Sequence, residues 1–159
     1  MELNIVNIIQ AMLAPAIMVS ASGLLLLGAN NKYSMVVTRI RALDEEIRKY
    51  KHQQRTATLE PDILHRLESL YHQIDKLSQR VKLIRNAVVS YFTGVLFFII
   101  TCLVIGLEYT LEYHVYILII LTFLIGMLSI LSGIIFSVYE AIRGYEIVTM
   151  EINDTLKTK

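Results

Sequence analysis

The residues best suited to metal or acid–base chemistry in this sequence are four histidines and one cysteine. They are His52, His65, His72, His114 and Cys102. His65 and His72 lie seven positions apart, two helical turns from each other, whereas metal ligands on one helix are about three to five positions apart. The chain has no CxxC, HExxH or phosphate-loop motif, and no Ser–His–Asp arrangement can be assembled. We therefore predict surface histidines, no catalytic residue, no metal site, no cofactor and no small-molecule substrate, and we expect that the protein is not an enzyme.

The segments that carry these residues are separated by three long windows without any charge. Residues 3–31, 87–107 and 115–139 contain no Asp, Glu, Lys, Arg or His. A helix needs about 20 apolar residues to cross roughly 30 Å of hydrocarbon, and each window is long enough. The apolar fraction of 55% also exceeds the level of soluble domains. The sequence predicts an all-α integral membrane protein with three transmembrane helices.

The first window has an alternative interpretation as a cleaved signal peptide, since residues 20–23 are small like a cleavage site. However, no basic residue precedes the apolar run, and the first positive charge is Lys32, after the run. Signal peptides show the opposite order of charge. We expect the first window to be a retained membrane helix.

The orientation follows from the distribution of Lys and Arg. Residues 32–85 carry 12 of the 15 basic residues, whereas residues 108–114 carry none and contain two glutamates. Because short cytoplasmic segments are enriched in Lys and Arg, we predict an outer N-terminus, with the charged segment and the C-terminus in the cytoplasm.

The charged segment has the spacing of an antiparallel, coiled-coil-like hairpin. Its apolar residues recur at alternating intervals of three and four, as in a coiled-coil seam. In the first arm they are Tyr33, Val36, Ile40, Leu43, Ile47 and Tyr50, and in the second Ile63, Leu67, Leu70, Ile74, Leu77, Val81 and Ile84. Antiparallel pairing of these positions puts the turn near residues 58–59, where Thr56, Thr58 and a Glu-Pro-Asp sequence at 60–62 are turn signals.

The same seam continues into the membrane windows. Backwards from the first arm it meets Ala29, Leu26, Ser22 and Val19, and forwards from the second arm Val88, Tyr91 and Val95. No Gly or Pro interrupts residues 30–57 or 62–91. We therefore expect two long helices that each pass from the membrane into the charged segment without a break.

Small residues and one proline within the windows are candidate packing sites. Small residues four positions apart allow helix backbones to approach closely. The candidates are Pro15, Ser20, Gly23, Gly126, Ser129 and Gly133. Packing within one chain and packing between copies both fit these positions.

A polar collar follows the first window at Asn30, Asn31, Lys32 and Tyr33. Such residues bind a lipid headgroup or a partner protein, or they lie at the interface and are satisfied by water. We treat them as candidate interaction residues, and we expect a protein partner or self-association through the hairpin.

Two function classes remain after these observations. Ion-coupled transporters generally place Asp, Glu, His or Arg within the membrane, and none of these four residue types lies in the three windows. The mixed charges of residues 32–85, without a recognition motif, also disfavour nucleic-acid binding. We predict a non-enzymatic interaction or assembly component that works through helix–helix contacts. The alternative is an oligomeric channel or transport accessory subunit, with a pore face from Ser20, Ser22, Thr93 or Thr101.

The stretch LAPAIMVSASGLLLLGANNKYS at residues 13–34 resembles a bacterial family of small three-span membrane proteins known only as a domain of unknown function. The similar positions are Pro15, Ser20, Gly23, Leu24, Leu25, Leu27, Gly28, Asn30, Asn31, Lys32 and Tyr33, with residues 39–43 in addition. The resemblance implies a location in a bacterial inner (cytoplasmic) membrane. It implies no activity, substrate or catalytic residue. It implies the layout that the residues also predict: a helix at 1–31, a hairpin at 32–86, helices at 87–107 and 115–139, an outer loop at 108–114 and a tail at 140–159.

Overall fold

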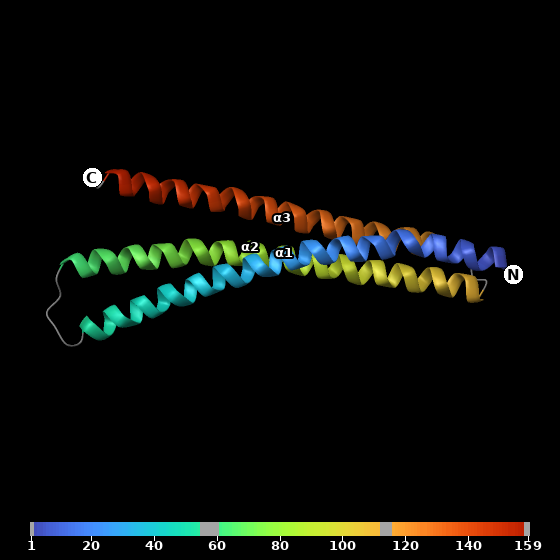
Figure 1. Cartoon of the computed structure of the whole chain (residues 1–159), viewed down its shortest axis with the longest axis horizontal. Helices are drawn as coiled ribbons and strands as arrows, with labels where there is room; N and C mark the ends of the chain where they lie inside the picture. Colours follow the sequence, from blue (N-terminus) through green and yellow to red (C-terminus); the bar gives the residue numbers. More distant parts are fainter. Residues whose placement is uncertain (1, 55–60, 112–115, 158–159) are drawn as a thin grey trace. The chain divides into compact units, whose positions relative to one another are not determined.

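The protein is all-helical in the part of the chain that the structure describes. The computed structural model describes residues 2–54, 61–111 and 116–157, and side chains at 6–52, 64, 66–108 and 116–144. These residues form helices α1 (Glu2–Gln54), α2 (Pro61–Leu111) and α3 (Tyr116–Lys157), with no strand among them (Figure 1). Within the described residues, Val6–His52, Arg66–Glu108 and Tyr116–Gly144 contain stretches long and apolar enough to cross a membrane. The predicted fold class, a helical membrane protein with three spans, is therefore confirmed.

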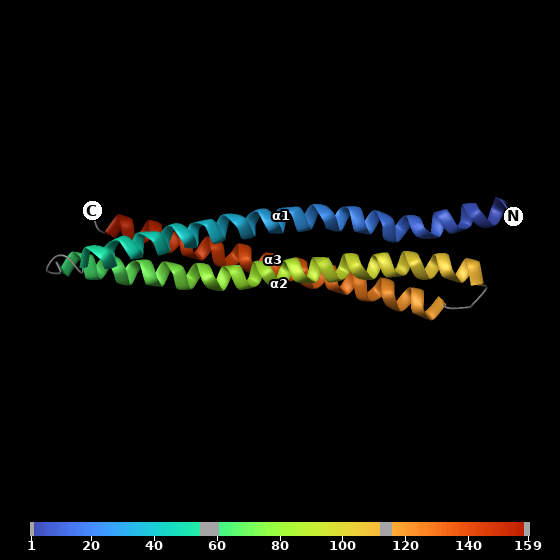
Figure 2. The same cartoon turned by 90° about the horizontal axis from the view of Figure 1, so that it is seen from below.

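Helices α1 and α2 are continuous, as the absence of interior breakers at residues 30–54 and 62–91 predicted. Figure 2 shows both as uninterrupted ribbons. Helix α2 begins at Pro61, where proline costs little because the first-turn N–H has no partner within the helix. The predicted turn at residues 58–59 lies outside the described residues.

The boundaries predicted after residues 107 and 139 are changes in composition, and helices α2 and α3 continue past them. Helix α2 ends at Leu111, so the first four residues of the segment expected as an outer loop are helical, and residues 112–114 are not described. No Gly or Pro occurs at 108–111 to stop the helix. Helix α3 likewise continues from the uncharged window to Lys157.

The chain divides into two compact units, each considered separately. The first, which we call the apolar unit, comprises residues 1–30 and 86–137, and the charged unit comprises residues 31–85 and 138–159. In the charged unit, α1 and α2 share a cluster of buried Leu43, Ile47, Leu67 and Leu70, with Tyr50, Ile74 and Leu77 packed against it. All seven belong to the seam predicted from spacing. Their pairwise order, and coiled-coil geometry as such, stay predictions.

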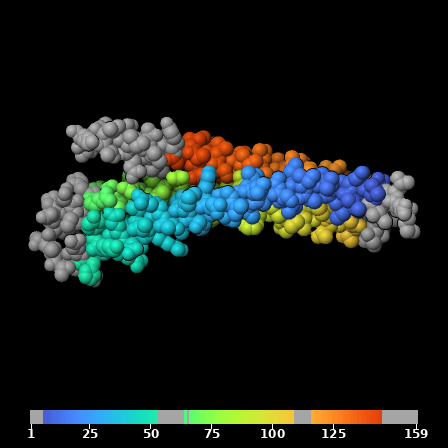
Figure 3. Space-filling view, viewed as in Figure 1, coloured from blue at the N-terminus to red at the C-terminus, as the bar shows by residue number. Residues whose placement is uncertain are grey.

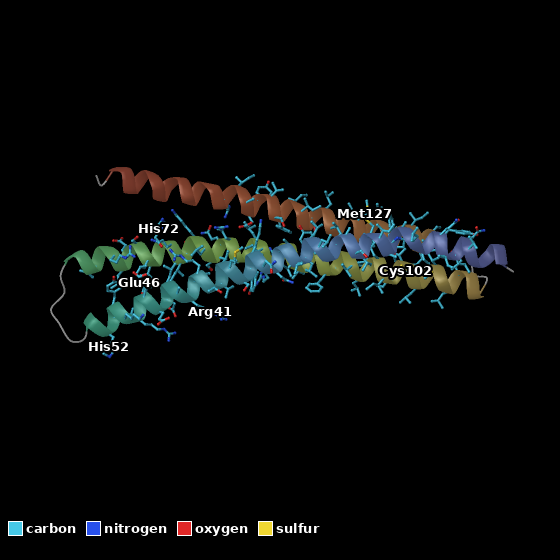
Figure 4. The ribbon with its side chains drawn as sticks, viewed as in Figure 1. Arg41, Glu46, His52, His72, Cys102 and Met127 are labelled. Carbon is cyan, nitrogen blue, oxygen red and sulfur yellow. The ribbon has the colours of Figure 1, made fainter. Side chains whose placement is uncertain are left out.

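An ion pair joins the same two arms beside this cluster. The Arg66 guanidinium donates to Glu46 Oε1 through Nη2 at 3.0 Å and Nε at 3.3 Å. Glu46, labelled in Figure 4, lies on α1 next to α2. Both side chains are partly exposed, so this pair adds little stability to the apolar packing.

In the apolar unit the seam continues as predicted. Ala29, Ala87 and Tyr91 form a buried cluster with Leu26 and Val88 against it, and Ile130 and Phe136 of α3 join it. Apolar side chains on the outside cover much of this unit, as expected for contact with lipid. The α1 portion of this unit is blue in Figure 3. On α2, exposed apolar residues recur at helical spacing: Val89, Phe92, Leu96, Ile99, Leu103 and Leu107.

Candidate functional site: a buried carboxylate held by two cations

The charged unit contains one buried ionised side chain among its described residues. Glu140 is the first charged residue after the uncharged window at 115–139, and α3 continues through it. Its exposed fraction is only 2%. A carboxylate removed from water to this extent is costly unless both oxygens find cationic partners.

Both oxygens of Glu140 are satisfied by cations from the other two helices. Arg80 of α2 donates to Oε1 through Nη2 at 2.6 Å and Nε at 3.2 Å. Lys32 of α1 donates to Oε2 through Nζ at 3.1 Å. We call these three residues, one from each helix, the ionic clamp. It holds three helices of the charged unit together through one carboxylate.

The two cations are less buried than the carboxylate. The side chains of Arg80 and Lys32 are 23% and 48% exposed, against 3% for Glu140. The cations therefore keep part of their hydration, whereas the anion depends on them entirely. Such asymmetry makes the removal of a cation more costly than the removal of the anion.

Gly144, one turn after Glu140 on α3, leaves room for the arginine. A methyl group at Gly144 would lie 3.0 Å from Arg80 Nη2 and 3.1 Å from Cζ. Next to it, Arg143 Nη1 donates to Gln79 Oε1 of α2 at 3.2 Å. The clamp is thus flanked by a second polar contact between the same helices.

Comparison with known proteins assigns the chain to a family. A family model described as protein of unknown function (DUF2721) matches residues 12–150. The chain belongs to the DUF2721 family. The match includes all three residues of the clamp, and the resemblance to a family of unknown function seen at residues 13–34 is confirmed. No curated protein and no solved structure matches the chain.

The collar residues of this DUF2721 protein have different environments. Lys32 belongs to the clamp. Asn31 and Tyr33 are exposed on the charged unit, and Asn30 is exposed on the apolar unit. Of the four predicted interaction residues, Lys32 is the one that joins the ionic clamp, through an ion pair with Glu140 that the sequence did not predict.

Sequence reasoning did not find the clamp. In the sequence, Glu140 is a single charge after the third window, and Arg80 is one of 12 basic residues at 32–85. A usable signal exists, because Glu140 and Lys32 are each the first charge after an uncharged window. Two opposite charges at corresponding boundaries are candidates for a pair, but the partner on α2 depends on a register between α2 and α3 that no local pattern gives.

Two of the three candidate packing residues of α3, Gly126 and Gly133, lie against aromatic rings of α2 in the apolar unit. A methyl group at Gly126 would lie 2.8 Å from Phe98 Cε1, and one at Gly133 would lie 2.6 Å from Tyr91 Cε1. Ser129 is half-buried, and its carbonyl accepts a hydrogen bond from Ser132 at 2.8 Å. The two glycines therefore serve packing within this chain.

The candidates of α1 differ from one another. Pro15 is buried, Ser20 is exposed, and nothing lies within 4 Å of a methyl group placed at Gly23. Near Pro15, the Cys102 thiol donates to the Met12 carbonyl oxygen at 3.9 Å, which is a weak contact. Pro15 thus lies in a packed part of α1, whereas Ser20 and Gly23 leave an open surface.

Hydroxyl groups also join α2 to α3 in the apolar unit. Thr101 donates to the Phe97 carbonyl at 2.8 Å and contacts Thr122 Oγ1 at 3.0 Å, and both threonines are buried. The hydroxyls of Tyr91 and Ser137 are 3.0 Å apart. Among the described residues, every buried side-chain oxygen or nitrogen atom has a hydrogen-bond partner, as an apolar environment requires.

Both histidines whose side chains the structure describes lie on the surface. His52 lies at the end of α1 and His72 on α2, and both are exposed (Figure 4). Among the described residues no three His, Cys, Asp or Glu side chains could hold a metal ion together.

Proposed function

We propose that this DUF2721 protein is a non-enzymatic assembly component of a bacterial inner membrane that acts through helix–helix contacts. The observation that carries the proposal is the α1–α2 hairpin of the charged unit. Its core is closed around Leu43 and Leu70, so the pair of helices has a defined shape. Most of its described exposed positions carry polar or charged residues, which suits recognition by another protein.

The orientation that we propose places the hairpin and the C-terminal end in the cytoplasm and residue 1 outside. The support is the concentration of basic residues at 32–85 and their absence from 108–114. In this orientation Asn31 and Tyr33 lie at the inner headgroup layer, exposed on the charged unit, where a partner reaches them together with the hairpin surface.

The alternative, a channel or transport accessory subunit, has less support from the same side chains. Ser22 donates to the Met18 carbonyl at 2.6 Å, and Thr93 donates to the Val89 carbonyl at 2.9 Å. Ser22 and Thr101 are also buried against neighbouring helices of the apolar unit. A pore lined by these hydroxyls would require the bundle to open, so we rank assembly first.

Native mass spectrometry of the protein, released gently from its own membrane, tests the proposal. We expect a complex with a foreign subunit, retained in Ser69→Asp and lost in Leu70→Asp. The two substitutions add the same charge at neighbouring positions, but Ser69 is exposed and Leu70 is fully buried in the hairpin core. Circular dichroism of both variants reports whether the helices remain.

Two results would overturn it. A homo-oligomer without a foreign subunit, together with ion flux in liposomes, would favour the channel. A Leu70→Asp protein that keeps both its helicity and its foreign subunit would show that the hairpin is not the docking element.

A further inference from the structure

In the charged unit, the two arms of the hairpin are joined by apolar packing, whereas the described contacts of α3 with the hairpin are polar. Among the described side chains at 138–144, only Glu140 and Gly144 are buried. The apolar residues Val138, Tyr139 and Ile142 are all exposed. Residues 138–144 of α3 therefore add no buried apolar side chain to the charged unit, and the described members of its core cluster belong to α1 and α2.

The contacts that the described side chains of this segment make with the hairpin are polar. They are the two ion pairs of Glu140, with Arg80 and Lys32, and the hydrogen bond between Arg143 and Gln79. Apolar packing is insensitive to charge and salt, whereas ion pairs that reach the surface weaken as ionic strength rises. The attachment of α3 to the hairpin consequently depends on charge.

Separation of the segment would leave the rest of the charged unit intact. The described members of the cluster around Leu70 all lie on α1 and α2, so the proposal expects their burial to remain. Arg80 and Lys32 are already partly exposed and can complete their hydration once Glu140 leaves. Glu140 itself would move from a buried site into water, which a carboxylate favours.

We propose that Glu140 is an electrostatic latch: it holds the segment of α3 that begins at Val138 against the α1–α2 hairpin, and the segment separates from the folded hairpin when the contact with Arg80 and Lys32 is broken. Release uncovers a cationic surface of the hairpin formed by Lys32 and Arg80, with Gln79 beside it. When the latch opens, the carboxylate of Glu140 leaves, and an external anion can then reach Lys32 and Arg80. It does not depend on which partner the hairpin binds, or on whether the assembly function is correct.

Distances between spin labels test the latch in the full-length protein in lipid nanodiscs, with Cys102→Ser as the background. One pair of labels, at Ile142 and His72, reports the distance between α3 and α2. A second pair, at Met35 and His72, reports the hairpin itself. All three label positions are exposed and lie outside the clamp.

The test variant is Glu140→Gln, and the matched control is Glu46→Gln. Both remove the charge of a glutamate paired with an arginine between two helices, but Glu46 pairs with Arg66 within the hairpin, whereas Glu140 joins α3 to the hairpin. For Glu140→Gln we expect the ratio of separated to attached molecules, from the Ile142–His72 distances, to rise about tenfold or more, as for the loss of one charge-assisted hydrogen bond. The Met35–His72 distance should stay unchanged, and Glu46→Gln should leave both distances as in the parent.

A charge exchange provides a second test. Arg80→Glu places two carboxylates together and should also release the segment, whereas Arg80→Glu and Lys32→Glu combined with Glu140→Arg should restore attachment, because both ion pairs are then reversed in sign. High salt should separate the parent protein but not change the Glu140→Gln variant further.

Three results would overturn the latch. In the first, Glu140→Gln keeps the distance distribution of the parent. In the second, Glu46→Gln broadens the Ile142–His72 distance equally. In the third, the Met35–His72 distance broadens together with the other pair, which would make Glu140 a general stabiliser of the fold.

Discussion

Replacing Gly133 by alanine tests whether α2 and α3 approach each other as closely as the structure shows. A methyl group there would lie 2.6 Å from Cε1 and 2.7 Å from Cδ1 of Tyr91, and 3.2 Å from the Ala87 carbonyl oxygen. The ring cannot move aside freely, because Tyr91 is 2% exposed and its hydroxyl is bonded to Ser137. Overpacking of this kind costs about 1–3 kcal/mol.

The same substitution at Gly23 provides the matched control. Nothing lies within 4 Å of its added methyl group. Alanine is better than glycine in a helix by about 1 kcal/mol, and both positions gain this amount. We therefore expect Gly23→Ala to stabilise the protein by up to about 1 kcal/mol, and Gly133→Ala to be less stable than Gly23→Ala by about 1–3 kcal/mol, the cost of the clash.

Reversible unfolding of the monomer in mixed micelles, followed by tyrosine fluorescence, measures this difference. The chain has nine tyrosines and no tryptophan, so the signal includes the ring in question. Equal stability of the two variants would refute the argument, because the glycine would then not be needed for the approach of the helices.

Two further predictions concern the packing inside each unit. Leu70→Ala should cost the hairpin about 2–5 kcal/mol, because the residue is fully buried, whereas Leu64→Ala, at an exposed position, should change stability by less than about 0.5 kcal/mol. Hydrogen exchange of the hairpin amides measures both, and equal protection in the two variants would contradict the prediction. Thr101→Val, Thr122→Val and the double variant should give a coupling free energy of about 0.6 kcal/mol, typical of a hydrogen bond between membrane helices; a coupling of zero in the same micelle assay would mean that the hydroxyls do not interact.

The parts of the fold that local spacing determines were predictable. Leu43, Ile47, Leu67 and Leu70 repeat at intervals of three and four, and they form the core of the hairpin. Their periodicity is a property of each arm alone, so it can be read without knowledge of the partner helix. The same reasoning extended the seam to Ala29 and to Tyr91 in the apolar unit, as the structure shows.

The position of α3 could not be predicted in this way. Its outward positions are as apolar as its inward ones, since lipid accepts any apolar side chain, and periodicity therefore gives no face. Its contacts use glycines against rings, as at Gly126 and Phe98, which leave no heptad pattern. Without the register of α3, neither Arg80 nor Lys32 could be matched to Glu140.

This difference explains why the contacts of α3 with α2 include polar groups in each unit. In lipid, apolar helix surfaces gain little by choosing one neighbour over another, because the tails are equally apolar. A buried hydroxyl or carboxylate does discriminate, because only one rotation and one height of the helix satisfy it. Thr122 has such a role opposite Thr101 in the apolar unit, and Glu140 opposite Arg80 in the charged unit. The hydroxyl pair is neutral and enclosed, whereas the clamp is charged and reaches the surface through its cations. In the latch that we propose, the contacts of α3 with α2 in the apolar unit are therefore independent of charge, whereas those in the charged unit depend on it.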